Sequence, residues 1–140
     1  MFLLDTNVVS ELRKAHSGKA NANVAGWAAK ARASSLFLSA IVVQELEVGA
    51  LRIERRDPQQ GALIRRWLEA EVLRTFADRI LPIDVAIARR SAALNVPDPR
   101  PFRDSLIAAT ALVHGLTVVT RNISDFASTG VSLLNPWQTN

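Results

Sequence analysis

Hydrophobic and polar residues follow two patterns along this chain, and the two patterns alternate. Short runs of consecutive apolar residues are typical of strands that are buried on both faces of a sheet. Longer segments, in which apolar residues recur every three or four positions, are typical of helices with one buried side. We predict strands at 1–4, 36–38, 79–83, 116–119 and 131–134, helices at 8–14, 21–32, 41–56, 57–76, 85–95 and 104–114, and a single helical turn at 122–126.

Residues with special backbone preferences support several of these boundaries. Three residues that favour N-cap positions stand at the starts of predicted helical segments: Ser39, Asp57 and Asp84. Gly115 is expected to end a helix, since glycine readily adopts the left-handed conformation. Pro82 cannot donate to a neighbouring strand, so we expect its strand to lie at a sheet edge or to end at the proline. Gly49, inside a predicted helix, is expected to let a neighbouring element approach closely.

The order of the elements predicts the fold class. Strands alternate with helices along the whole chain, and parallel strands need helical crossovers of this kind. We therefore expect a three-layer α/β/α fold, in which helices cover both faces of a central, mostly parallel sheet of about four to five strands. With 140 residues and no internal repeat, the chain is expected to form a single domain over residues 1–140.

Composition limits the compartment and the partner. The chain has no cysteine, which excludes disulfide bonds and thiolate metal sites, and its N-terminus lacks the features of a secretion signal. We therefore expect a soluble, cytoplasmic protein that does not span a membrane. The formal net charge is +4, with 14 arginines and 3 lysines against 13 acids. Arginine suits contacts to phosphate, so this balance favours an RNA or DNA partner, although an arginine-rich genome would produce the same composition.

Four acids are placed near the carboxyl ends of predicted strands, where open α/β sheets bind their ligands. They are Asp5 after the first strand, Glu45 in the helix after the second, Asp104 in the helix before the fourth, and Asp125 after the fourth. Like charges about 4 Å apart repel by roughly 4 kcal/mol at an effective dielectric of 20, so convergent carboxylates require a counter-charge. With no cysteine and no paired histidines, the donors favour Mg²⁺ or Mn²⁺, ions that orient water and stabilise a phosphodiester during displacement.

Each of the four acids also has a purely structural interpretation. Asp5 could cap the helix that follows it, and Asp104 could stabilise the first turn of its own helix. Asp125 lies three residues after Asn122, as in a capping arrangement. Glu45 could be one of the solvent-facing glutamates that helices commonly carry. The residues alone leave both kinds of interpretation open.

Other sites with an acid after a strand fit this sequence less well. The chain contains no glycine-rich phosphate loop. A haloacid-dehalogenase-like phosphatase would have a second aspartate at position 7, where this chain has Asn7. A response-regulator receiver would have a lysine at the end of a late strand, whereas every lysine here precedes residue 31.

With these residues in place, the chain resembles the PIN domains, specifically the VapC-type toxins of type II toxin–antitoxin systems. Four stretches carry the resemblance in the expected order: LLDTNVVSEL (3–12), LSAIVVQEL (38–46), RDSLIAATAL (103–112) and VVTRNISDF (118–126). The resemblance implies a PIN-like fold and a Mg²⁺- or Mn²⁺-dependent endoribonuclease whose acidic cluster is Asp5, Glu45, Asp104 and Asp125. Four polar positions match residues near such sites: Thr6, Asn7, Thr120 and Asn122.

The same resemblance implies partners. Similar toxins dimerise and are held by a small antitoxin whose C-terminal segment covers the acidic groove. Three apolar residues of the helix 57–76 are candidates for such an interface or, equally, for the core: Leu63, Trp67 and Leu68. Three arginines are candidates for contacts to the RNA backbone: Arg52, Arg103 and Arg121.

Two alternatives to a toxin remain open from the sequence. The chain could be a catalytically silent module of the same fold that binds RNA or a protein partner. It could also be a housekeeping ribonuclease without an antitoxin. The presence of all four acids argues against the silent module.

Overall fold

The computed structural model describes residues 1–138. Within these residues, five short strands form one sheet in the order β3-β2-β1-β4-β5, and every neighbouring pair is parallel. The strands are β1 (Phe2–Leu4), β2 (Leu36–Ser39), β3 (Ile80–Leu81), β4 (Thr117–Val119) and β5 (Leu133–Leu134). The predicted α/β fold with a parallel central sheet is confirmed.

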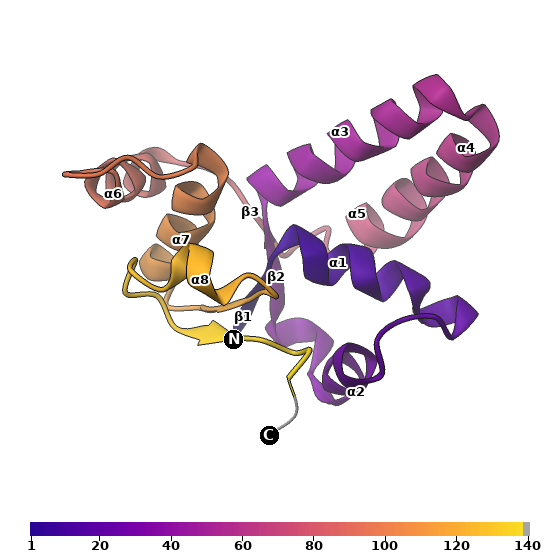
Figure 1. Ribbon diagram of the computed structural model, residues 1–140, viewed down its shortest axis with the longest axis horizontal. Helices are drawn as coiled ribbons and strands as arrows, with labels where there is room; N and C mark the ends of the chain where they lie inside the picture. The colour runs from indigo at the N-terminus through magenta and orange to yellow at the C-terminus, as the bar shows by residue number, and fades with distance from the viewer. Residues whose placement is uncertain (139–140) are drawn as a thin grey trace.

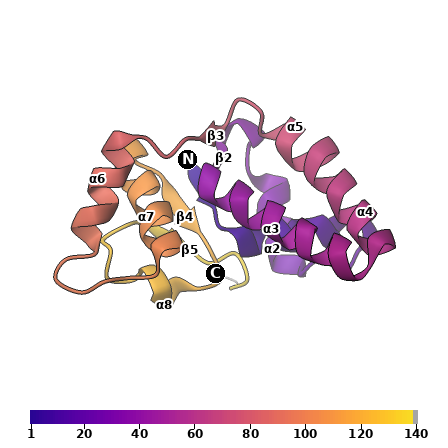
Figure 2. The same ribbon diagram turned by 90° about the horizontal axis from the view of Figure 1, so that it is seen from above.

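Helices connect the successive strands. They are α1 (Thr6–Leu12), α2 (Ala22–Lys30), α3 (Ala40–Arg56), α4 (Pro58–Trp67), α5 (Leu73–Thr75), α6 (Val85–Leu94), α7 (Phe102–His114) and α8 (Ile123–Phe126), with 3-10 turns at Arg13–Ser17 and Ala33–Ser35. Figures 1 and 2 show α6 and α7 on one side of the sheet and the long hairpin of α3 and α4 extending away on the other. None of the helices in the described range has both the length and the apolar character needed to cross a membrane.

The central strand β1 carries the first acid to the binding edge of the sheet. Leu3 and Leu4 are fully buried, and β1 pairs with β2 on one side and β4 on the other. Because these strands run in the same direction, their carboxyl ends meet at one edge. Asp5 follows β1 and Thr120 follows β4, so the two are neighbours although 115 positions separate them in the sequence.

The predicted caps and the predicted edge strand are confirmed. The side chains of Ser39, Asp57 and Asp84 accept hydrogen bonds from backbone N–H groups in the first turns of α3, α4 and α6. Gly115 ends α7 in the left-handed conformation, with a φ of 67°. The strand β3 lies at the edge of the sheet and ends directly before Pro82.

The segment predicted as one helix over residues 57–76 contains a π-helical turn at Leu68–Val72, between α4 and α5. The three interface candidates in this segment differ in burial. Leu68 is fully buried in the core, and Trp67 is half-buried. Leu63 is 54% exposed, so it is the candidate that keeps a large free surface.

The prediction that Gly49 allows a close contact is wrong, and Gly61 has this property instead. A Cβ atom on Gly49 would have no neighbour within 4 Å, whereas one on Gly61 would lie 2.4 Å from the Cα atom of Glu54. Gly61 therefore lets α4 pack directly on the backbone of α3. Arg65 fastens the same hairpin, because its Nη2 atom lies 2.6 Å from carboxylate oxygens of both Glu47 and Glu54.

We expect Gly61→Ala to destabilise the protein by about 1–3 kcal/mol, because the added methyl group must displace the backbone of α3. Gly49→Ala is the matched control, since it adds the same group in open space, where alanine favours the helix by about 1 kcal/mol. Urea unfolding of both variants measures the two opposite signs. A Gly61→Ala protein as stable as the wild type would contradict the close packing of α3 and α4.

Candidate active site

Asp5 is the centre of a network of buried polar groups. The residue is 0% exposed. Its Oδ1 atom accepts hydrogen bonds from the backbone N–H of Thr6 at 2.7 Å and from Arg103 Nη1 at 3.1 Å. Its Oδ2 atom accepts from the hydroxyl group of Thr120 at 2.7 Å and from Asn7 Nδ2 at 3.3 Å. Each oxygen is held by two donors, which fixes the orientation of the carboxylate.

Two further acids reach the same place from other elements. Glu45 comes from α3, where its Oε1 atom accepts from the hydroxyl group of Thr6 at 2.6 Å and its Oε2 atom lies 2.8 Å from Arg103 Nε. Asp104 comes from the first turn of α7, and its Oδ1 atom lies 3.3 Å from Arg103 Nη1. The structure therefore brings Asp5, Glu45 and Asp104 together around one guanidinium group.

The fourth acid, Asp125, stands at the rim of this cluster. It is an exposed residue of α8. Its charge raises the pKa of Asp104, so the two carboxylates lie within electrostatic reach. In the described part of the chain, the hydrogen bond of Asp125 runs from its backbone N–H to the carbonyl of Asn122, not from its carboxylate to the other acids.

The four polar residues predicted from the sequence connect the turn after β4 to the start of α1. Thr6 and Thr120 donate their hydroxyl groups to carboxylates of the cluster. The side-chain oxygen of Asn7 accepts from the backbone N–H of Arg121 at 3.2 Å. The hydroxyl oxygen of Thr120 also accepts from the backbone N–H of Asn122 at 3.0 Å. This turn is therefore fixed relative to Asp5, while the Asn122 residue itself is exposed.

The structural interpretations of the acids have different outcomes. Asp5 does cap α1, so one side chain combines the cap with membership of the cluster. Asp104 does lie in the first turn of α7. This helix begins at Phe102, two residues earlier than predicted, because Pro101 occupies the N-cap position. Asn122 makes no side-chain bond to the start of α8, so the expected capping with Asp125 is absent there. Glu45 is bonded inside the cluster and is not a solvent-facing glutamate.

Burial raises the pKa of Glu45 and of Asp104 above the ordinary carboxylate range. For Glu45, loss of hydration is the main cause, neighbouring acids add to it, and hydrogen bonding and the charge of Arg103 oppose it. For Asp104, burial again dominates; Arg103 lowers the pKa, and the charges of Asp125 and Asp5 raise it. The cluster therefore holds more negative charge than one guanidinium group neutralises, a condition that favours a cation of higher charge.

The donor set fits a hard divalent cation. Carboxylate oxygens are ligands that Mg²⁺ and Mn²⁺ prefer, and the Arg103 guanidinium group is itself a cation at the point where three carboxylates converge. No three acidic or histidine residues within residues 1–138 are already spaced to hold a metal ion. The acids contact the guanidinium group and not one another, so a shared metal ion would require them to move closer together.

Glu45→Gln is expected to raise the melting temperature of the protein in EDTA at neutral pH, by at most about 4 °C. The raised pKa of Glu45 means that folding disfavours its ionised form. The folded protein therefore becomes less stable as the pH rises through the folded-state pKa of Glu45. The advantage of the variant should therefore shrink at mildly acidic pH. Scanning calorimetry at the two pH values measures the difference.

Glu47→Gln is the control with the opposite sign. The hydrogen bond from Arg65 lowers the pKa of Glu47, so the ionised form of this group stabilises the fold at neutral pH. Its replacement should lower the melting temperature there. A Glu45→Gln variant that behaves like Glu47→Gln would contradict the unfavourable burial of the Glu45 charge.

Arg103 is the residue of the site whose position the sequence did not predict. It was a candidate for the RNA backbone, whereas the structure places it among the carboxylates, with 28% of its side chain exposed. Its position directly before Asp104 was the available signal. The other candidates lie elsewhere: the Arg121 guanidinium group stacks 5.3 Å from the ring centre of Trp137, and Arg52 is exposed on α3.

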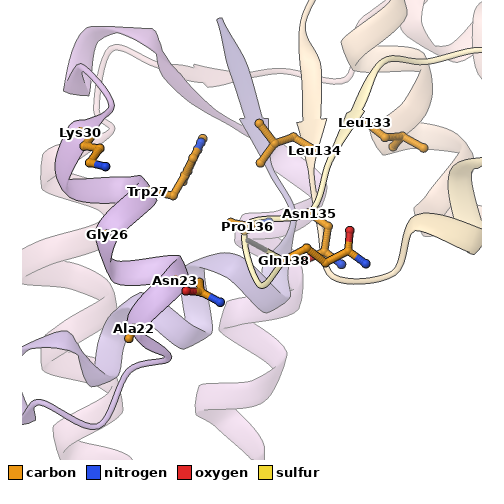
Figure 3. Close-up of a pocket in the computed structure, with 10 residues that line it drawn as sticks. All are labelled: Ala22, Asn23, Gly26, Trp27, Lys30, Leu133, Leu134, Asn135, Pro136 and Gln138. Carbon is orange, nitrogen blue, oxygen red and sulfur yellow. The ribbon is translucent and has the colours of Figure 1, made fainter. Parts of the chain in front are cut away.

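A cavity of about 730 Å³ lies between α2 and the segment after β5, and none of the four acids lines it (Figure 3). Trp27 stands on one side of this cavity and Leu134 on the other. Trp27 packs edge-on against Phe2, with ring centres 5.3 Å apart. Asn23 Nδ2 donates to the Trp137 carbonyl at 2.8 Å and joins the two walls. The cavity is thus separate from the acidic cluster.

Comparisons with known proteins find relatives that match almost the whole chain. The family model of the PIN domain matches residues 2–131. The VapC ribonuclease Y4jK of Sinorhizobium fredii is 37% identical to this chain over an alignment of 143 residues. The alignment covers 99% of each protein. Among solved structures, FitAcB from Neisseria gonorrhoeae has a TM-score of 0.89 and 34% identity, covering 99% of this chain and 100% of that one. A toxin-antitoxin complex from Klebsiella pneumoniae has a TM-score of 0.67 and 28% identity, with coverage of 99% and 100%.

Proposed function

The chain belongs to the PIN domain family, and we propose that it is a Mg²⁺- or Mn²⁺-dependent endoribonuclease that acts as the toxin of a toxin–antitoxin pair. One observation carries this proposal. Three acids that are far apart in the sequence converge on the guanidinium group of Arg103: Asp5, Glu45 and Asp104. The relative that is named a ribonuclease matches this chain along almost its whole length, which supports RNA as the substrate.

Asp5, Glu45 and Asp104 would hold the metal ion, and Asp125 would complete the site from the rim. When bound, Mg²⁺ or Mn²⁺ would activate water for attack and stabilise the charge that develops on the phosphodiester. Thr6 holds Glu45 and Asp5 in place through its hydroxyl and backbone N–H groups. Because these carboxylates are oriented before any substrate arrives, little reorganisation is needed during the reaction.

The charge of the chain supports a polyanionic substrate. Its net charge of +4 is carried mainly by arginines, whose guanidinium groups bind phosphate oxygens. Arg121 is exposed, and its backbone is bonded to Asn7 beside the cluster. We assign Arg121 as an exposed contact for the RNA backbone beside the cluster.

A small antitoxin protein would cover the acidic groove, and the chain would assemble as a homodimer or a larger complex with it. The structural neighbour from Klebsiella pneumoniae, described as a toxin-antitoxin complex, supports such an assembly. Leu51 on α3 and Leu63 on α4 are 55% and 54% exposed, so the α3–α4 hairpin presents apolar side chains that suit a protein contact.

The direct test is incubation of the purified protein with total RNA in the presence of Mg²⁺, Mn²⁺ or EDTA, followed by mapping of the cut ends. We expect defined cuts with either metal and none in EDTA. RNA binding without any metal-dependent cleavage would overturn the proposed activity in favour of a silent module.

A second experiment separates a toxin from a housekeeping ribonuclease. Expression of the chain alone is expected to arrest growth, and co-expression of a small open reading frame from beside its gene is expected to restore it. Unimpaired growth with a protein that cleaves RNA in vitro would indicate a housekeeping ribonuclease instead.

A further inference from the structure

Arg103 contacts three different carboxylates with one side chain. Its Nη1 atom lies 3.1 Å from Asp5 Oδ1 and 3.3 Å from Asp104 Oδ1, and its Nε atom lies 2.8 Å from Glu45 Oε2. The side chain is 28% exposed, so it stands at the mouth of the cluster and not beneath it. An ion from solution can therefore reach the guanidinium group.

Two of the remaining carboxylate oxygens are held by other groups. Asp5 Oδ2 is bonded to Thr120 and Asn7, and Glu45 Oε1 is bonded to Thr6. These bonds would survive if the guanidinium group left. Its departure would leave Asp5 Oδ1, Glu45 Oε2 and Asp104 Oδ1 facing the space that it vacates, with the Asp5 and Glu45 carboxylates still oriented by their other partners.

Two other arginines show what a purely structural role looks like in this protein. Arg65 also pairs with several acids, but the side chains of those acids are 37% to 64% exposed and lie outside the acidic cluster. Arg100 bonds the Leu94 carbonyl and Ser128, which are neutral groups. Of these three, Arg103 is the arginine whose partners are the acids of the candidate site.

We propose that Arg103 is an internal counter-ion that occupies the metal-binding oxygens in the metal-free protein and that a divalent cation must displace it. This inference rests on the proposed function, because it concerns the same site. A guanidinium group and a metal ion need the same oxygen lone pairs, so they compete for Asp5, Glu45 and Asp104. The protein therefore keeps its acids compensated without metal and binds metal more weakly than the acids alone would.

The test measures Mn²⁺ binding by isothermal titration calorimetry, without RNA, for the wild type, Arg103→Gln, Arg103→Lys and Arg90→Gln. Arg90 is exposed on α6, which packs against α7, so its replacement removes the same charge without touching the cluster. We expect Arg103→Gln to bind Mn²⁺ about tenfold more tightly, which corresponds to the loss of one competing charge-assisted hydrogen bond of about 1.4 kcal/mol. Arg90→Gln is expected to match the wild type.

Arg103→Lys separates displacement from simple charge repulsion. Lysine keeps the positive charge but cannot bridge three carboxylates with a planar fork, so its Mn²⁺ affinity should fall between those of the wild type and Arg103→Gln. Wild-type affinity in Arg103→Lys, together with tighter binding by Arg103→Gln, would assign the effect to charge alone and overturn displacement. Unchanged or weaker binding by Arg103→Gln would also overturn it.

Thermal unfolding supplies a second readout and shows whether each variant folds. In EDTA, Arg103→Gln is expected to melt below the wild type, because its acids lose their counter-ion, and Mn²⁺ should raise its melting temperature by more than it raises that of the wild type. If Arg103→Gln does not fold, Arg103→Lys carries the comparison. Absence of Mn²⁺ binding in every protein would refute the metal-dependent function itself, whereas equal affinities in a protein that cleaves RNA would refute the role of Arg103 alone.

Discussion

Replacement of Asp5 by asparagine is expected to reduce RNA cleavage by about 10³-fold or more while the protein remains folded. Removal of one of three converging carboxylate charges should weaken metal binding by several kcal/mol, and each 1.4 kcal/mol is a factor of ten in rate. Asparagine is as good an N-cap as aspartate, so the cap of α1 is retained. Cleavage of RNA with Mn²⁺ and the melting temperature are measured on the same preparation.

Asp78→Asn is the matched control for this variant. It removes the same charge from a side chain that is 87% exposed and precedes β3, at the opposite end of the parallel sheet from the cluster. It should cleave RNA like the wild type. Full activity of Asp5→Asn would sink the assignment of the cluster as the active site, and loss of activity in both variants would point to a general effect of charge.

The sheet and the convergence of the acids were predictable because both depend on local patterns. Strands covered on both faces contain continuous apolar residues, as in Leu3 and Leu4, and a parallel sheet then places whatever follows each strand at one edge. Asp5 and Thr120 are such residues. Less periodic elements were predicted less well: the last strand comprises Leu133–Leu134 only, instead of residues 131–134.

Features that depend on the crossing of distant elements were not predictable. Gly61 is a contact glycine because Glu54 of α3 passes within backbone distance, and no pattern within either helix determines that crossing. The bond between Arg103 and Asp5 joins positions 98 residues apart. In the sequence, Arg103 is one of 14 arginines, and only its position directly before Asp104 distinguishes it.

Asp5 shows why the structural and functional interpretations of one acid need not compete. Its Oδ1 atom caps α1 through the N–H of Thr6, and the same atom faces the guanidinium group. The cap does not prevent Asp5 Oδ1 from binding a second partner, because a carboxylate oxygen has two lone pairs and the N–H group of Thr6 uses only one of them. The helix start therefore orients the carboxylate that the proposed chemistry needs.

Replacement of Thr120 by valine is expected to lower RNA cleavage by about 10- to 100-fold, the usual loss when a group that orients a metal ligand is removed. Thr120 is fully buried, and its hydroxyl group donates to Asp5 Oδ2 at 2.7 Å. Valine has the same shape without the hydroxyl group, so Asp5 would lose one of its donors and the backbone N–H of Asn122 would lose its acceptor. The affinity for Mn²⁺ should fall together with the cleavage rate, which calorimetry and RNA assays measure in parallel.

Thr110→Val separates this positioning role from a general cost of removing a buried hydroxyl group. Thr110 is also fully buried, but its hydroxyl group donates to the carbonyl of Leu106 within α7, away from the acids. We expect both variants to lose on the order of 1 kcal/mol of stability. Only Thr120→Val should lose Mn²⁺ affinity, because only Thr120 holds a carboxylate of the cluster. Equal Mn²⁺ affinities in the two variants would show that Asp5 is oriented well enough by Thr6 and Asn7 alone.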